Sequence, residues 1–352
     1  MSKSAKRIIP AGHIQIKENV LKMDNLAGVS ESKALWAKDL HLPREAEYTF
    51  FAACGYQHMN YLQGMMKALK RAGKMGLGTE KVVGITKAFK KAGVNLTHIA
   101  AKVTAAKEDP YTPVLLSSIN VLRKLGVDVG YMHAEEPCCG SPIYYAGFEK
   151  DFAAHARKNN EIFKSFGVKK LIGLVPGCTS ALRNLYPRYI KDFDLPIQHV
   201  LEVVAQRLKE IDIKPIAKQK VTVTYHDPCQ LSRYLEIIDE PREIIKRIEG
   251  VEFIELDPEQ CGKWSTCCGG GGLEAAHPDL AERVGLRRIE ELLATGASVV
   301  LSNCPACDMQ LTQTAKKMGA NVQVVDLMRF LDDALQPDKN RIDAKSKLTD
   351  VN

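Results

Sequence analysis

The 352-residue sequence lacks the long apolar runs of a membrane protein. No segment approaches the roughly 18 uninterrupted apolar residues that a spanning helix needs, and the polar N terminus has no apolar signal core. These absences predict a cytoplasmic protein without a membrane span. The sequence also lacks a G-x-G-x-x-G fingerprint and a ferredoxin C-x-x-C-x-x-C run, so we do not expect the chain to complete an electron circuit alone.

Cysteine is too sparse for a disulfide scaffold, because the chain has only 10 in 352 residues. The cysteines are nevertheless too clustered to be ordinary core residues. A reducing compartment would keep them available as thiolates. Their pattern therefore favours metal binding or redox chemistry.

Positive charge is concentrated in one segment rather than spread over the chain, whose formal net charge is +7. Between Lys67 and Lys107, ten residues are Lys or Arg and one, Glu80, is acidic. Basic residues with helical spacing there are Lys67, Lys70, Arg71, Lys74, Lys87, Lys90 and Lys91. The pattern fits either a solvated face or a docking surface for an acidic partner. Without interleaved aromatic residues, no nucleic acid is expected to bind.

The chain is a two-fold repeat. In each half a β-rich run ends in a cysteine, a helix leads to a short strand and Cys-Cys-Gly, and a long helix leads to a strand before another cysteine. Expected strands are 48–54, 126–131 and 170–175 in the first half, and 221–229, 250–256 and 298–302 in the second. Expected helices are 114–125 and 148–166, and 241–248 and 278–294.

Strands that alternate with helices predict an α/β fold of two tandem, pseudo-symmetric half-domains, in which short parallel sheets are flanked by helices and cysteines lie at strand ends. The expected organisation is an N-terminal extension at 1–44, a first repeat at 45–195, a second at 196–336 and a polar tail at 337–352. A basic helical insertion at about 56–110 interrupts the first repeat.

The second half has five cysteines in one repeat unit. Cys229 is followed after 37 residues by Cys267-Cys268-Gly269, and 35 residues separate Cys268 from Cys304-Pro-Ala-Cys307. Five thiols exceed the four of a tetrahedral zinc site and of an ordinary cubane cluster. The count suggests a larger or opened iron–sulfur unit.

This spacing resembles that of the cysteine-rich CCG domain family, and in particular the B-type subunit of heterodisulfide reductases and its relatives in sulfur-oxidising bacteria. The resemblance covers about residues 45–335. It implies that Cys229, Cys267, Cys268, Cys304 and Cys307 hold a non-cubane [4Fe-4S] cluster that binds and splits a disulfide.

The resemblance further implies a catalytic oxidoreductase subunit for thiol, disulfide or carrier-bound sulfane sulfur. Its implied partners are other iron–sulfur and flavin subunits and a lipoate-type sulfur carrier. Two other functions remain open: an electron-relay subunit for lactate or glycolate oxidation, which also uses tandem CCG repeats, and a zinc-stabilised scaffold.

The first half departs from the family pattern. Cys54 precedes Cys138-Cys139-Gly140 by 83 intervening residues, and Ala181 is expected at the position of the second cysteine in the C-x-x-C motif that Cys178 would begin. The four cysteines Cys54, Cys138, Cys139 and Cys178 suit an iron–sulfur cluster or zinc.

Other residues near the second cysteine set have structural and functional interpretations. Gly269 and Gly270 either form a turn or let backbone N–H groups approach cluster sulfurs. His226 and Asp227 either pack and cap or move a proton to a thiolate. Cys261 suits a small core residue or a redox thiol, and Trp264 suits a packing residue or a platform for the substrate.

Overall fold

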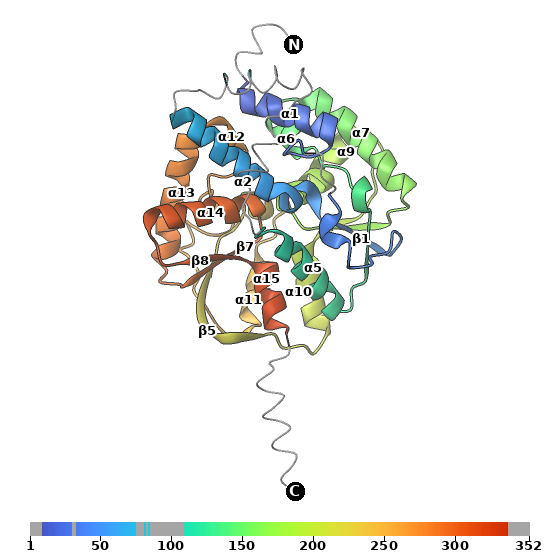
Figure 1. Ribbon diagram of the computed structural model, residues 1–352. Coiled ribbons are helices and arrows are strands. Elements are labelled where there is room, and N and C mark those ends of the chain that lie inside the picture. Colours follow the sequence, from blue (N-terminus) through green and yellow to red (C-terminus); the bar gives the residue numbers. More distant parts are fainter. Residues whose placement is uncertain (1–8, 30–32, 75–80, 82–83, 85–108, 337–352) are drawn as a thin grey trace.

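The computed structural model describes residues 9–29, 33–74, 81, 84 and 109–336. Each half of the chain contains a four-stranded parallel sheet that is flanked by helices (Figure 1). The predicted fold class is therefore confirmed. In the described ranges, no helix has the length and apolar character that a bilayer crossing requires.

The first sheet has the strand order β2-β1-β3-β4. Its central strands are almost wholly buried, as expected where helices cover both faces of a parallel sheet. The strands are β1 (Tyr48–Phe51), β2 (Val129–Tyr131), β3 (Lys170–Gly173) and β4 (Ile197–His199).

The main helices of the first half follow its strands. They are α2 (Ala53–Lys74), α5 (Thr112–Lys124), α6 (Ser141–Tyr145), α7 (Glu149–Ser165), α8 (Pro176–Ser180), the π-helix η4 (Ala181–Leu185), α9 (Tyr186–Tyr189) and α10 (Val200–Glu210). Helix α7 buries Phe152, Ala156 and Phe163 along one face, at the spacing that brings side chains together on a helix.

The second sheet repeats this arrangement with the order β6-β5-β7-β8. Its strands are β5 (Ile216–Tyr225), β6 (Glu249–Phe253), β7 (Val299–Ser302) and β8 (Gln323–Asp326). Its helices are the π-helix η5 (Gln230–Tyr234), α11 (Asp239–Lys246), η6 (Gly262–Trp264), α12 (Gly272–Ala276), α13 (Pro278–Leu293), α14 (Pro305–Met318) and α15 (Leu327–Ala334).

Strands β4 and β8 were not expected from the sequence. β4 pairs with β3 through Leu171 and Ile197. The first sheet therefore continues beyond residue 195, the predicted end of the first repeat.

The two halves pack through equivalent elements and share a large hydrophobic core. Helix α5 contacts α15, while their counterparts α11 and α10 contact each other. Likewise, α2 contacts α14 and η5 contacts α8. A Cβ added to Gly55 at the start of α2 would lie 3.2 Å from the ring of Pro305, the first residue of α14. The junction between the halves is thus formed by elements that follow the cysteines.

The N-terminal extension covers part of this junction. Helix α1 (Ala11–Met23) contacts α6 of the first half and α12 of the second, the helices that follow the two Cys-Cys-Gly segments (Figure 1). Lys17 pairs with Asp151 at 2.7 Å, and the His13 ring bonds the Gly272 carbonyl at 3.1 Å. The extension therefore ties the two halves together.

Candidate metal centres

Five sulfurs of the second half converge from three segments beyond the ends of the strands. Cys229 follows β5, Cys267 and Cys268 precede α12, and Cys304 and Cys307 follow β7. The Cys267 thiol interacts with the thiols of both Cys229 and Cys268. The Cys307 thiol interacts with those of both Cys268 and Cys304. The structure thus brings together all five residues that the family spacing selected.

Two of these sulfurs lie where negative charge is stabilised. Hydrogen bonds from Cys229 and Cys268, helped by the backbone N–H of Gly269, lower the pKa of Cys267. The pKa of Cys304 is lowered by Cys307, first through its side chain and then with Ala306 through backbone N–H groups at the start of α14. The site therefore offers thiolates, the form in which cysteine binds metals.

The glycines after the cysteine pair bring backbone close to these sulfurs. Gly269 N–H lies 3.4 Å from Cys267 Sγ, and Gly270 N–H lies 3.3 Å from Cys268 Sγ. A Cβ at Gly269 would lie 2.2 Å from the Ala281 carbonyl oxygen, at a backbone φ of +83°. Only glycine suits this position without displacement. Soft thiolates with N–H donors aimed at them fit an iron–sulfur cluster.

The first half gathers four buried sulfurs in the same pattern. Cys54 Sγ lies 3.5 Å from Cys138 Sγ, and Cys139 Sγ lies 2.9 Å from Cys178 Sγ. Hydrogen bonds from Cys138 and Cys178 lower the pKa of Cys139. This donor set suits a cubane iron–sulfur cluster or zinc.

The register of the two sheets aligns the cysteines of the halves. Gly173 of β3 pairs with His199, whose side chain caps α10. Ser302 of β7 pairs in the same way with the residue that caps α15. Because Gly173 and Ser302 are equivalent, Cys178 corresponds to Cys307, which has the same offset from its strand.

The cysteine that the first half lacks is consequently at position 175 and not at 181. Val175 precedes Pro176 at the start of α8, as Cys304 precedes Pro305 at the start of α14. The expectation that Ala181 replaces a ligand was wrong, because it aligned Cys178 with the first cysteine of C-x-x-C. Ala181 instead begins the π-helix η4.

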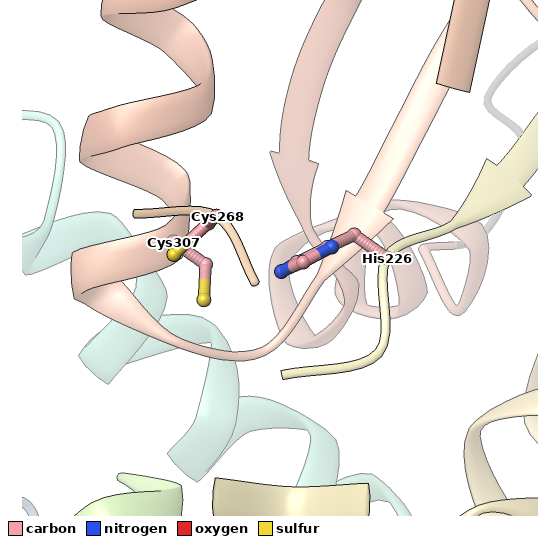
Figure 2. Close-up of side chains that lie close together, drawn as sticks. All are labelled: His226, Cys268 and Cys307. Atoms are coloured by element: carbon pink, nitrogen blue, oxygen red, sulfur yellow. The ribbon is translucent and has the colours of Figure 1, made fainter. Parts of the chain in front are cut away.

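His226 lies in the second centre and is fully buried. A ring nitrogen of His226 and the sulfurs of Cys268 and Cys307 all lie within 4.8 Å of one another (Figure 2). Burial is the main cause that lowers the pKa of this imidazole, and the charge of Arg288 adds to it. Arg288, which the sequence pattern did not single out, donates to the other ring nitrogen at 3.0 Å.

Asp227 has a structural position beside this histidine. Its carboxylate accepts two hydrogen bonds from Arg242, at 2.8 and 2.9 Å, and a third from Gly262 N–H at 2.8 Å. These bonds hold the loop that leads to Cys267. Asp227 therefore serves to fix the loop geometry.

Cys261 and Trp264 belong to the same loop. Cys261 is half-buried, its thiol donates to the Pro258 carbonyl at 3.9 Å, and burial is the main cause that raises its pKa. These features suit a packing role in the second core cluster, which it borders. Trp264 is 76% exposed, which contradicts the packing role. Its role as a substrate platform stays a prediction.

The basic segment is only partly described. Lys67 and Arg71 are exposed, and Lys70 and Lys74 belong to the same helix, α2. Lys87, Lys90 and Lys91 lie outside the described residues. Docking of an acidic partner on this segment stays a prediction.

A family model described as a cysteine-rich domain, CCG, matches residues 101–183 and 223–312. Both matches contain a Cys-Cys-Gly segment, and the second also includes Cys229, Cys304 and Cys307. Cys54 lies before the first match, as expected if the inserted segment separates it from the rest of its repeat.

The chain is similar to subunits of several oxidoreductases. It is 35% identical over 228 residues to the D-type subunit of the dihydromethanophenazine:CoB–CoM heterodisulfide reductase of Methanosarcina mazei, covering 62% of this chain and 54% of that protein. It is 32% identical over 228 residues to the B-type subunit of the fumarate reductase (CoM/CoB) of Methanothermobacter marburgensis, covering 63% and 43%. An EtfAB:quinone oxidoreductase of Syntrophomonas wolfei is 31% identical over 239 residues, covering 65% and 33%. The chain thus spans about half or less of these relatives.

Proposed function

Since this chain is a cysteine-rich CCG-domain protein related to heterodisulfide reductase subunits, we propose that it is an iron–sulfur subunit of a heterodisulfide reductase-like oxidoreductase. The C-terminal half is its site of sulfur chemistry. The observation that carries this proposal is the convergence of five cysteine sulfurs in that half, against four in the other.

The substrate class that suits such a site is a disulfide, its thiols, or a carrier-bound sulfane sulfur. Reduction of a disulfide R–S–S–R′ breaks one S–S bond, takes up two electrons and two protons, and releases RSH and R′SH. When bound, a non-cubane [4Fe-4S] cluster supplies single electrons and an iron position for a substrate sulfur. The electrons come from flavin or iron–sulfur partner subunits.

The residues of this chain hold and shield that chemistry. The five cysteines Cys229, Cys267, Cys268, Cys304 and Cys307 bind the iron. Gly269 and Gly270 place N–H groups against two of the sulfurs. Because Cys268 and Cys307 are buried, a substrate sulfur approaches from the side of the less buried Cys229, Cys267 and Cys304.

The first half holds a second iron–sulfur cluster under this proposal. The same pairing of its four sulfurs as in the second half supports iron–sulfur over zinc. Val175 occupies the position of the fifth ligand and cannot bind metal. This centre therefore serves electron supply.

An electron-relay subunit without its own substrate is the second candidate. The similarity to an EtfAB:quinone oxidoreductase favours it, and relay subunits of lactate or glycolate oxidation belong to the same class. A relay needs reversible cluster reduction but no response to thiols.

Thiol binding to the anaerobically purified chain separates the two candidates. We expect coenzyme M or dihydrolipoamide, added under oxidising conditions, to change the paramagnetic resonance signal of the C-terminal centre. Cys304→Ser should abolish this change, because it removes the ligand that the first half lacks, whereas Cys178→Ser should retain it.

Two results would contradict the proposal. Loss of the response in Cys178→Ser but not in Cys304→Ser would place the chemistry in the first half. Reversible reduction of the wild-type clusters without any response to either thiol would favour the electron relay.

A further inference from the structure

The His226 side chain points into the C-terminal centre, and one of its two ring nitrogens makes no hydrogen bond with the described residues. Figure 2 shows the imidazole extending from the loop after β5 toward Cys268 and Cys307. Its Nε2 atom is buried and finds no hydrogen-bond partner within the part of the chain that the structure describes. A buried polar atom without a partner is destabilising, so this nitrogen requires a ligand or a hydrogen-bond acceptor in the centre.

The hydrogen bond from Arg288 determines whether this nitrogen carries a proton. The Nε–H of Arg288 donates to His226 Nδ1 at 3.0 Å. A guanidinium has only donors, so Nδ1 must be the unprotonated nitrogen of the ring. In a neutral imidazole the proton is then on Nε2. The atom that faces the sulfurs is therefore an N–H group and has no lone pair to offer a metal.

Other contacts hold the Arg288 side chain in the position from which it bonds His226. Its side chain is fully buried, and its Nη1 donates to the Gln260 carbonyl at 2.8 Å and to Glu291 Oε2 at 2.9 Å. Glu291 is itself held by Thr266 Oγ1 at 2.9 Å. Two acceptors besides the histidine therefore hold the guanidinium, both through Nη1.

The equivalent positions of the first half, Phe51 and Asn159, do not form such a pair. Phe51 stands three residues before Cys54, as His226 stands three residues before Cys229. Phe51 is the last residue of β1, and His226 directly follows the equivalent strand β5. Phe51 packs its ring against Phe163 at a centroid distance of 6.2 Å. Asn159 takes the place of Arg288, 20 residues after the second cysteine of the pair, and bonds the Cys138 carbonyl.

We propose that His226 is a hydrogen-bond donor to the sulfurs of the C-terminal centre and not one of its ligands, and that Arg288 is the positioning residue that fixes it in this role. This inference rests on the proposed function, because it requires a cluster in that half. It assigns one feature that distinguishes the substrate centre from the centre of the first half. A hydrogen bond to a cluster sulfur favours the reduced, more negative state and so raises the reduction potential.

The full chain with His226→Phe, the residue of the first half, tests the donor. Its iron content should equal that of the wild type, because no ligand is lost. Its C-terminal centre should become harder to reduce by about tenfold in the equilibrium constant, or about 59 mV for a one-electron couple. His226→Gln, which keeps an N–H donor, should recover part of this shift in a redox titration followed by paramagnetic resonance.

Arg288→Lys and Arg288→Met test the positioning residue. Lysine keeps a donor and should restore more of the reduction potential than methionine, at equal iron content. Loss of the C-terminal iron in both His226→Phe and His226→Gln would make His226 a ligand and overturn the inference. An unchanged potential in His226→Phe would also overturn it. A wild-type chain without iron would instead refute the proposed function.

Discussion

Replacement of Cys268 by serine is expected to remove the C-terminal cluster, and with it about four irons per chain. Cys268 is buried and its sulfur contacts both Cys267 and Cys307, so it links the two arms of the ligand set. A serine oxygen is a hard donor on a shorter side chain and does not replace a soft thiolate toward this kind of iron. Iron analysis of the anaerobically purified full chain, with paramagnetic resonance, measures the loss.

Cys261→Ser is the matched control for this substitution. Cys261 belongs to the same half but donates its thiol to the Pro258 carbonyl, away from the five-sulfur set. The control should keep the wild-type iron content. A normal C-terminal signal in Cys268→Ser would remove Cys268 from the ligand set, and equal iron loss in both variants would indicate general damage rather than loss of a ligand.

Asp227→Asn is expected to lower the free energy of unfolding by about 3 kcal/mol, the range for breaking a buried ion pair. The side chain of Asp227 is 1% exposed and that of Arg242 is 11% exposed. The carboxylate accepts from three N–H donors, two from Arg242 and one from Gly262. In an asparagine the NH2 group would face one of these donors, and neither group could accept. Urea denaturation of the anaerobically purified chain, monitored by circular dichroism, measures the change.

Glu236→Gln provides a surface control for the same measurement. Glu236 pairs with Lys263 at 2.7 Å, but both side chains are more than half exposed, so solvent and salt screen the pair. This variant should unfold at the wild-type urea concentration. A comparable loss in both variants would mean that burial does not increase the contribution of the Asp227–Arg242 pair to the free energy of unfolding.

Sequence reasoning succeeded where local patterns determine structure. Apolar runs and helical spacing are local signals, so most strands and long helices were located within a few residues of their observed bounds, as with α13 at Pro278–Leu293. The spacing of the five C-terminal cysteines can be read directly from the sequence, because they lie in the segments that follow three of its strands. The structure accordingly brings them together.

The sequence could not supply features that depend on pairing between distant segments. Val175 and Ala181 are both apolar residues near Cys178. Comparison of the β3–β4 register with the β7–β8 register shows that Val175 is the one that aligns with a cysteine. Arg288 likewise reads as one charged residue on an amphipathic helix. Its contact with His226 joins residues 62 positions apart.

Metal analysis of the anaerobically purified full chain, combined with paramagnetic resonance, tests the central claim most directly. Two iron–sulfur centres predict about eight irons per chain and at least one signal that responds to reduction. The C-terminal contribution should disappear in Cys268→Ser. Zinc bound to both cysteine sets, with no iron and no reducible signal, would contradict the claim and leave a zinc-stabilised scaffold.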